Sequence, residues 1–347
     1  MPYLCPLCGG IYEIYLNSDL KLGQMDDSLP GIWRYRSAFG IPETAPMTYL
    51  GEGNTPIIWR KAFSKDVIFK LEFLNPTGSY KDRATAVLTS MLKQRNVSNA
   101  IEDSSGNAGA SFAAYAAAFD IDAEIYIPAS TSGPKRRQVE SYGVTVIPIP
   151  GPRSEAARSA QAAVTRKGIT YASHAFLPFG MAGIATIAYE LVEQIGNAPG
   201  TIIAPIGHGS LFAGIMLGFR ALKESSCIKE LPSFVGVQAD KCAPVWAKWV
   251  GYDFNQKECT TIAQGTQIVN PVRGGLILDL LSKTNDKIVK VSEAEIKDAI
   301  HKLANQGIYV EPTSALVWAA LENNIHNLRE PIALILTGFG LKSDVVV

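Results

Sequence analysis

Charge is scarce in this sequence of 347 residues, and it is evenly balanced. Charged side chains make up 18% of the chain, and 32 Lys and Arg stand against 32 Asp and Glu, so the formal net charge is +0. Soluble domains ordinarily carry about 25% charged residues. A chain without a net field of either sign has little electrostatic attraction for a polyanion or an anionic bilayer. We therefore expect no nucleic-acid partner and no membrane partner.

Long apolar runs and a regular cysteine pattern are also absent. No stretch approaches the roughly 20 consecutive apolar residues that cross a bilayer. The first residues do not join a basic start to an apolar run, as a secretory leader does. The cysteines are odd in number and irregularly spaced, which is a poor match to a disulfide framework. These absences together favour a cytoplasmic protein.

Apolar residues, by contrast, are plentiful. They make up 47% of the chain, which is enough for a sizeable core without covalent staples. The length predicts about two domains at roughly 150 residues each. The low charge and large apolar fraction also suggest a buried subunit interface, and a homodimer is the usual symmetric assembly.

Short β-rich apolar runs alternate with Ala-rich stretches that have helical spacing. This alternation predicts βαβ units and an α/β fold with mostly parallel sheets flanked by helices. The strand runs are continuously apolar, as expected of strands covered on both faces. The predicted strands are 67–73, 100–102, 124–127, 144–149, 201–205, 234–237, 287–291 and 332–336, and the predicted helices include 108–119, 154–166, 182–195 and 210–222.

Four polar or Gly-rich segments each follow a predicted strand. In open α/β sheets, ligands bind beyond the carboxyl ends of the strands, so these four segments are expected to meet. The first is NPTGSYKDR at 75–83, in which a Pro-Thr-Gly turn precedes Lys81 at the start of a helix. The positive end of a helix, together with partial burial, disfavours an ammonium group. An uncharged lysine amine is what a carbonyl cofactor requires, although taken alone this lysine also fits an exposed position in a first helical turn.

The second segment is DSSGNAGAS at 103–111. Its Gly and Ser residues form a strand-to-helix turn whose free N–H groups make an anion site, suited to a substrate carboxylate. Asn107 offers an amide to a phenolic oxygen. Ordinary helix capping by Ser104 or Ser105 is the simpler alternative.

The third segment is PIGHGSLFAG at 205–214, which predicts a cradle for a phosphate at the start of a helix. It partly matches the G-x-G-x-x-G fingerprint of dinucleotide sites, but Phe212 stands in place of the third glycine. No acidic residue follows at the distance that ribose binding needs. A single phosphate therefore fits better than a pyrophosphate. His208 is more simply a loop residue than a proton carrier.

The fourth segment is LTGFGLK at 336–342, where a buried strand ends at Thr337. A hydroxyl group in this position is able to bond a pyridine nitrogen. Taken alone, the segment also fits an ordinary strand-terminal turn.

Together with GEGNTP (51–56) and EPTSA (311–315), these segments resemble, in the same order, the threonine synthase branch of the fold type II pyridoxal-phosphate enzymes. The match extends from about residue 50 to residue 342, nearly the whole body of the chain. It implies the two-domain architecture of that fold type, which is similar to the tryptophan synthase β subunit. It also implies pyridoxal 5′-phosphate as the cofactor.

The resemblance implies a role for each matched residue. Lys81 would be the catalytic Schiff-base lysine, Asn107 would bond the 3′ oxygen of the cofactor, and Thr337 would face its pyridine nitrogen. Lys70, in the middle of the preceding predicted strand, has no turn to present it and is not expected to take that place. The remaining sites would be phosphate binding by Gly207, His208, Gly209, Ser210 and Leu211, and binding of the substrate carboxylate by Thr77, Ser79, Ser104, Ser105 and Gly106.

The implied reaction of this branch converts O-phosphohomoserine and water to threonine and phosphate. The chain departs from the family where an Asn-Pro-x-Arg-x-x-Gly-Gln-like segment is usual, because SHAFLPFGMAGIATIAYE at 173–190 has no arginine. The Gly-His-Gly-Ser loop also differs from the common Gly-Asn-x-Gly-Asn form. A substrate phosphate needs charge-assisted donors, and the candidates are Lys135, Arg136, Arg137 and Arg153.

Three alternatives to this reaction stay open. The nearest is β-replacement or β-elimination on a serine-type substrate, as in cysteate synthase-like or dehydratase-like enzymes. A paralogue that binds the cofactor without turnover is the second. An unrelated nucleotide-binding oxidoreductase is the third. Absorbance at about 410–420 nm, from a lysine-bound pyridoxal group, would exclude this third alternative.

The pair Cys5 and Cys8 lies in CPLCGG, which has the form of half a zinc ribbon. Two thiolates do not complete the four ligands of a structural zinc site, so we expect no metal unless a second pair comes from elsewhere. For the domains, we predict an N-terminal segment at 1–40 and a large cofactor-binding domain at 41–83 and 179–347. A small domain at 84–178 would be inserted into the large one, with the cofactor cleft between the two.

Overall fold

The computed structural model describes residues 2–19, 21–281 and 286–343, which divide into two compact units. Unit 1 comprises Met1–Asn17, Asp26–Gly53 and Asn75–Gly183, and unit 2 comprises Ser18–Met25, Asn54–Leu74 and Ile184–Val347. The units therefore divide the chain body at 53–54, 74–75 and 183–184. The domain boundaries predicted at 83–84 and 178–179 stay predictions.

Unit 1 is built on a parallel sheet of four strands in the order β5-β4-β3-β6. Apolar side chains of α1, α2 and α3 pack on one face of this sheet, and small alanines of α4 pack on the other. The elements are η2 (Gly31–Ala38), α1 (Lys81–Gln94), β3 (Asn99–Glu102), α2 (Asn107–Ala118), β4 (Asp122–Pro128), α3 (Gly133–Ser141), β5 (Thr145–Ile149), α4 (Arg153–Lys167) and β6 (Thr170–Tyr171).

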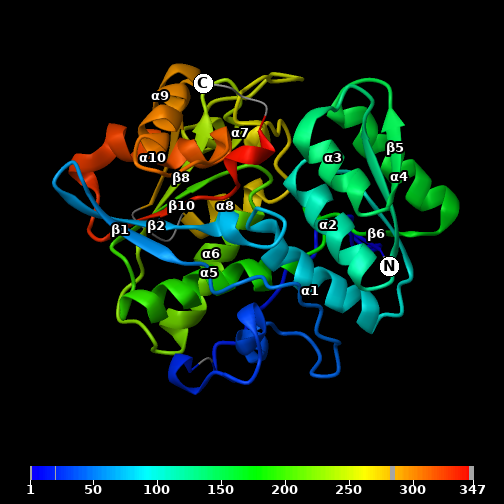
Figure 1. Ribbon diagram of the computed structural model, residues 1–347, viewed down its shortest axis with the longest axis horizontal. Coiled ribbons are helices and arrows are strands. Elements are labelled where there is room, and N and C mark those ends of the chain that lie inside the picture. The colour runs from blue at the N-terminus through cyan, green and yellow to red at the C-terminus, as the bar shows by residue number, and fades with distance from the viewer. Residues whose placement is uncertain (1, 20, 282–285, 344–347) are drawn as a thin grey trace. The chain divides into compact units, whose positions relative to one another are not determined.

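Unit 2 is built on a sheet of six strands in the order β1-β2-β10-β7-β8-β9. All neighbouring strands are parallel except β1 and β2, which are antiparallel. Figure 1 shows α9 and α10 on one side of this sheet and α5 and α6 on the other. The elements are η1 (Leu22–Gln24), β1 (Ile57–Ala62), β2 (Lys65–Lys70), η3 (Glu72–Leu74), α5 (Gly180–Ile195, its first turn in unit 1), β7 (Thr201–Pro205), α6 (Ser210–Glu224), β8 (Ser233–Ala239), α7 (Pro244–Trp249), η4 (Gln264–Thr266), α8 (Gly274–Leu281), β9 (Lys287–Val291), α9 (Glu293–Ala304), α10 (Pro312–Asn324), η5 (Ile325–Asn327), β10 (Ile332–Ile335) and η6 (Gly340–Lys342).

The predicted α/β class with mostly parallel sheets is confirmed, and each predicted strand lies on an observed one. Strands β7, β8 and β10 are buried almost throughout, because helices cover both faces of the sheet. Lys70 was placed in the middle of a strand at 67–73, but β2 ends at Lys70. Within residues 2–19, 21–281 and 286–343, no helix combines the length and apolarity needed to cross a bilayer.

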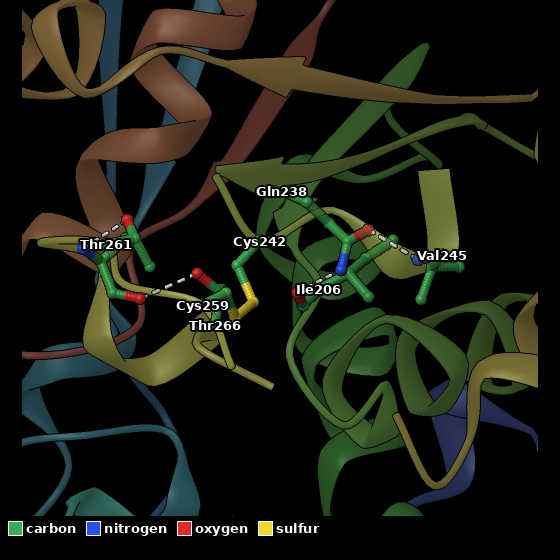
Figure 2. The surroundings of a disulfide bond; sticks show 8 residues. Ile206, Gln238, Cys242, Val245, Cys259, Thr261 and Thr266 are labelled. Atoms are coloured by element: carbon green, nitrogen blue, oxygen red, sulfur yellow. Dashed lines mark hydrogen bonds between the residues drawn. A yellow bond between two sulfur atoms is a disulfide. The ribbon is translucent and has the colours of Figure 1, made fainter. Parts of the chain in front are cut away.

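One pair of cysteines forms a disulfide, between Cys242 and Cys259 of unit 2 (Figure 2). Their Cα atoms lie 5.4 Å apart although 17 positions separate them in sequence. The irregular spacing of the cysteines did not indicate this pair, because the loop after α7 brings Cys259 back to the end of β8. Cys5, Cys8 and Cys227 take part in no disulfide with the residues that the structure describes.

Candidate functional site

Lys81 is the first residue of α1, as predicted, and its side chain is half-buried. No side chain caps this helix, since the N-cap residue Tyr80 makes no capping hydrogen bond. The Lys81 amine lies 4.8 Å from the centroid of the Tyr80 ring. It makes no hydrogen bond or ion pair with any residue that the structure describes. The amine is thus held beside an aromatic ring at the positive end of a helix, without a permanent acceptor.

A buried carboxylate fixes the turn that presents Lys81. Asp82 accepts hydrogen bonds from the N–H of Thr77 at 2.7 Å and from its hydroxyl at 2.6 Å. The hydroxyl of Ser111 in α2 also donates to Asp82, at 2.6 Å. Charge-assisted bonds of this kind are stronger than neutral ones. Asp82 was quoted in the motif without a role, and it ties the Pro-Thr-Gly turn and α2 to the start of α1.

The segment after β3 forms a tight turn into α2. The N-cap of α2 is Gly106, and no side chain caps the helix, so the alternative of capping by Ser104 or Ser105 is wrong. The Ser104 hydroxyl instead accepts from the N–H of Gly106 at 3.3 Å. A Cβ atom on Gly109 would lie 1.8 Å from the Ser104 carbonyl oxygen, so only glycine allows the loop to pack on its own helix. No capping side chain competes for the first N–H groups of α2, as an anion site requires.

Two ionisable residues that the sequence analysis did not single out lie at this same edge of the sheet. Glu102 ends β3 and is fully buried, and its carboxyl group contacts His174, which follows β6. Glu102 Oε1 lies 2.7 Å from His174 Nδ1, and Oε2 accepts the His174 N–H at 3.1 Å. Burial raises the pKa of Glu102 to about 7. Glu102 is in no motif, and His174 was quoted only within the segment at 173–190, so only the parallel pairing of β3 with β6 brings them together.

In unit 2, the Gly-His-Gly-Ser loop joins β7 to α6. The loop is close-packed, because a Cβ on Gly207 would lie 2.7 Å from the Gly265 carbonyl oxygen. Gly209 is the N-cap of α6 with a φ of 101°, and a Cβ there would lie 2.8 Å from Ile277. The hydroxyl of Ser210, the first helical residue, is buried and has no hydrogen-bond partner among the described residues. A buried hydroxyl without a partner is costly, so a ligand oxygen would satisfy it.

Gln238 of β8 anchors the start of this loop (Figure 2). Its amide nitrogen donates to the Ile206 carbonyl at 3.3 Å, and its amide oxygen accepts from the N–H groups of Val245 and Trp246, both at 3.0 Å. No sequence signal marked this fully buried glutamine. The disulfide in the same view joins the end of β8 to the segment that leads to Thr261 and Thr266.

Thr337 follows β10 and is buried, with its hydroxyl 3.0 Å from that of Ser314 in α10. The Ser314 hydroxyl also lies 2.9 Å from the N–H of Gly338, which donates to it. EPTSA and LTGFGLK, which are about 20 residues apart in sequence, therefore meet in one hydroxyl pair. Ser314 was within a quoted motif but had been given no role.

Lys70 has a very different environment from Lys81. It is completely buried, and its amine bonds three acceptors in unit 2. These are Glu190 at 2.7 Å, the Thr55 carbonyl at 2.7 Å and the Gln194 side chain at 3.0 Å. An ammonium group has three protons to donate, and here each has an acceptor. Lys70 is thus a structural cation that ties β2 to α5.

No cluster of three or more His, Cys, Asp or Glu residues arranged for a metal occurs in the part of the chain that the structure describes. Cys5 and Cys8 sit in a tight turn, where the Gly10 N–H approaches Cys8 Sγ at 3.4 Å. Hydrogen bonds, first of all that from the backbone of Cys8, lower the pKa of the Cys5 thiol. That Cys5 and Cys8 bind no zinc without a second pair of ligands stays a prediction.

Comparison with known proteins identifies a family and several relatives. The family described as "Pyridoxal-phosphate dependent enzyme" matches residues 48–338. The threonine synthase of Methanocaldococcus jannaschii is 31% identical, over 98% of this chain and 88% of its own length. The threonine synthase of Synechocystis sp. is 30% identical, over 89% and 82% respectively. The crystal structure of the T.th. threonine deaminase has a TM-score of 0.72 at 25% identity, covering 84% of this chain and 94% of that one.

Proposed function

The chain belongs to the pyridoxal-phosphate-dependent enzymes and, within them, to the threonine synthase family, and we propose that it converts O-phosphohomoserine and water into threonine and phosphate. Its cofactor is pyridoxal phosphate, and its homologues make it a carbon–oxygen lyase. When bound, this cofactor supplies an electron sink for charge that develops at the substrate α-carbon. Everything else, namely binding, orientation and proton transfer, falls to the protein.

The contrast between the two lysines carries the assignment of Lys81 as the cofactor-bearing residue. Lys70 is charge-paired with Glu190 and fully hydrogen-bonded, so freeing its amine would leave a buried carboxylate unpaired. Lys81 starts α1 and has no acceptor to give up among the described residues. A nucleophilic amine must be uncharged and accessible, and of these two lysines only Lys81 can meet both conditions.

The residues of the Gly-rich loop fit a phosphate group. The uncapped start of α6, the unpaired Ser210 hydroxyl and the close-packed glycines form a cradle in which an anion would take the place of a cap. We assign phosphate binding to Gly207, His208, Gly209, Ser210 and Leu211.

Other polar groups suit the remaining parts of the cofactor and substrate. Thr337 is proposed to face the pyridine nitrogen, with Ser314 orienting its hydroxyl, and Asn107 to bond the 3′ oxygen. The uncapped start of α2 suits the substrate carboxylate. The Ser79 hydroxyl is buried without a partner among the described residues, which also fits a ligand contact. The proposed carboxylate-binding residues remain Thr77, Ser79, Ser104, Ser105 and Gly106.

Two protein groups, the Lys81 amine and the Thr337 hydroxyl, govern the proposed proton transfers. The Lys81 amine, once uncharged, is the candidate base for the substrate α-proton. A threonine hydroxyl facing the ring nitrogen is a weak acid and cannot donate a full proton there, unlike a carboxylic acid. A hydroxyl group in this position would therefore limit how far negative charge spreads into the ring, and this favours elimination and replacement over transamination.

Three observations favour a second candidate reaction, β-elimination or β-replacement on a serine-type substrate. The segment at 173–190, where the family resemblance implied an arginine, begins with Ser173 and with His174, which contacts Glu102. Arg136, one candidate for a substrate phosphate, is bound to Glu140 at 2.8 Å and to the Thr131 carbonyl at 3.0 Å. The backbone similarity to a threonine deaminase points the same way.

Product analysis of the holoenzyme separates these reactions. O-phosphohomoserine, phosphoserine, serine and threonine would each be supplied while phosphate, threonine and 2-oxo acid are measured together. We expect stoichiometric phosphate and threonine from O-phosphohomoserine alone. A 2-oxo acid with ammonia from serine or threonine would replace the proposal by the elimination reaction, and no turnover of any substrate would contradict both.

We further propose that the enzyme is a homodimer in the cytoplasm. The thiols of Cys5 and Cys8 are outside any disulfide, which is consistent with a reducing compartment, and the Cys242–Cys259 pair is buried. Light scattering on the purified protein would measure the assembly directly, and a monomer at micromolar concentration would contradict the dimer.

A further inference from the structure

The contact between Glu102 and His174 places two ionisable groups at the carboxyl edge of the unit 1 sheet. Glu102 is fully buried, and the His174 side chain is only 11% exposed. The short distance of 2.7 Å between Glu102 Oε1 and His174 Nδ1 requires one proton between the two atoms. The second carboxyl oxygen is fixed by the His174 N–H, so the pair has a single geometry.

The Glu102–His174 pair has two protonation states, which differ by one proton and therefore in total charge. Burial, followed by the positive charges of Lys81 and Arg153, lowers the pKa of His174, so its ring is neutral near pH 7. The ring can then accept a proton from a neutral Glu102 carboxyl group or donate its Nδ1 proton to a Glu102 carboxylate. The first arrangement has no net charge, and the second carries one negative charge. The group that decides between them is Glu102.

The charged groups around the pair include the proposed cofactor lysine. Burial raises the pKa of Glu102 to about 7, while the His174 N–H and the charges of Lys81 and Arg153 act in the opposite direction. Asp103 is buried beside it, and burial also raises its pKa. Tyr171 of β6 completes the surroundings, and burial raises its pKa as well. The packing places Lys81 on this side of unit 1, because Asp82, the next residue of α1, accepts a hydrogen bond at 2.6 Å from Ser111 of α2, the helix that directly follows Glu102 and β3.

Electrostatic coupling acts in both directions, because the interaction energy between two charged groups affects the ionisation of each of them equally. If the Lys81 ammonium favours the Glu102 carboxylate, the carboxylate favours the ammonium equally. We propose that Glu102 and His174 form a buried proton-holding pair coupled to Lys81, which takes up one proton when the Lys81 amine loses its charge and releases it when the amine regains one. The inference rests on the role proposed above for Lys81.

Such a pair would keep the local charge constant while Lys81 acts as a base. When the amine gives up its proton, Glu102 takes one up. When the amine takes a proton from the substrate, Glu102 releases its own to solvent through the partly exposed His174 ring, so the net charge of the three side chains does not change. A buried site with constant charge avoids the cost of an uncompensated ion at either stage. Glu102 and His174 are therefore positioning residues that act through Lys81.

The first test uses the protein without cofactor and without substrate. The rate at which acetic anhydride modifies Lys81 would be followed by peptide mass spectrometry across a pH series. Glu102→Gln keeps the shape of the side chain and an oxygen to accept the His174 N–H, but removes the negative charge. At about pH 8 we expect Lys81 to react roughly 3- to 10-fold faster in this variant than in the wild type, because the ammonium has lost its partner.

Glu124→Gln is the matched control. Glu124 lies on β4 of the same sheet and pairs with Lys167 at the surface, at 2.6 Å. Its neutralisation should leave the modification profile of Lys81 unchanged. An unchanged profile in Glu102→Gln, with its thermal unfolding like that of the wild type, would overturn the proposal.

A second measurement keeps the proposal testable if Glu102→Gln does not fold. The imidazole resonances of His174 would be followed by NMR in the wild type and in Lys81→Met, again without cofactor. The wild type should show a titration step at about pH 7 from Glu102, and Lys81→Met should move it upward by at least about half a pH unit. A step that does not move would show that the pair and Lys81 are uncoupled. Neither measurement involves turnover, so failure here is distinct from failure of the proposed reaction.

Discussion

Each unit contains one of the two lysines weighed for the cofactor, but their surroundings are opposite. In unit 2, Lys70 ends β2 and is enclosed by three acceptors, one of them the Glu190 carboxylate. In unit 1, Lys81 begins α1 beside an aromatic ring, and no acceptor binds it among the described residues. Full pairing makes a lysine a fixed cation, whereas the absence of a partner leaves the amine free to change its protonation state.

The two carboxyl edges differ in the same way. The edge of unit 1 contains ionisable side chains, namely Lys81, Glu102 and His174. The edge of unit 2 offers backbone N–H groups and hydroxyls, at Gly209, Ser210 and Thr337. Groups with pKa values that depend on burial suit proton transfer, whereas groups that do not titrate suit the binding of an anion and a ring. The difference predicts which substitutions will affect chemistry, stability or cofactor affinity.

The largest effect is expected for Lys81→Ala. Without this amine, turnover should fall by at least about 1,000-fold, and the visible absorbance of the bound cofactor at about 410–420 nm should disappear. The fold should persist, because the amine makes no hydrogen bond or ion pair with the described residues. Absorbance spectra and circular dichroism measure both properties, and retained activity with a retained band would show that Lys81 is not the cofactor lysine.

Lys70→Met is the complementary substitution. It leaves the buried Glu190 without its cation, and we expect unfolding in urea to show a loss of about 3–5 kcal/mol. Any protein that remains folded should keep the visible absorbance band. The double variant Lys70→Met with Glu190→Leu removes both charges and should recover much of the loss. A stable Lys70→Met that lacks the band would reverse the roles of the two lysines.

Glu102 should give unit 1 a distinctive dependence of stability on pH. Because burial raises its pKa from an ordinary 4.5 to about 7, the folded state binds more protons than the unfolded state between these values. Its contribution to the free energy of unfolding should therefore fall as pH rises through this window, by an amount on the order of 3 kcal/mol. Urea unfolding of the wild type and Glu102→Gln across the window measures it. Parallel pH curves for the two proteins would contradict the shift.

The smallest effect is expected at the Gly-rich loop. Gly209→Ala places a Cβ against Ile277 and Arg273, so the loop must shift, and cofactor affinity should fall by roughly tenfold. Gly251→Ala is the matched control, since Gly251 also has a positive φ of 82° but has nothing within 4 Å of the added Cβ. Both variants should lose about 1 kcal/mol of stability from backbone strain. Equal cofactor affinity in the two, from titration with pyridoxal phosphate, would show that the loop does not hold the phosphate.

The predicted strands of the sequence analysis lie where the structure has them, because buried parallel strands are short continuous apolar runs. The start of α1 at Lys81 was equally readable from the preceding Pro-Thr-Gly turn. Strand β1 was missed because it lies at the sheet edge and is largely exposed, so its sequence IIWRKA lacks a buried pattern. Helix α10 was not among the predicted helices, because it is buried on nearly every side and has no polar face to set a period.

By itself, the sequence determined the α/β class, the cofactor family and the short motifs, since each of these depends on neighbouring residues. Only the tertiary structure decided which side chains meet. Glu102 meets His174, Lys70 meets Glu190, Thr337 meets Ser314 and Cys242 meets Cys259. The physical reason is that strand order and helix packing set these distances, and neither is encoded in local periodicity.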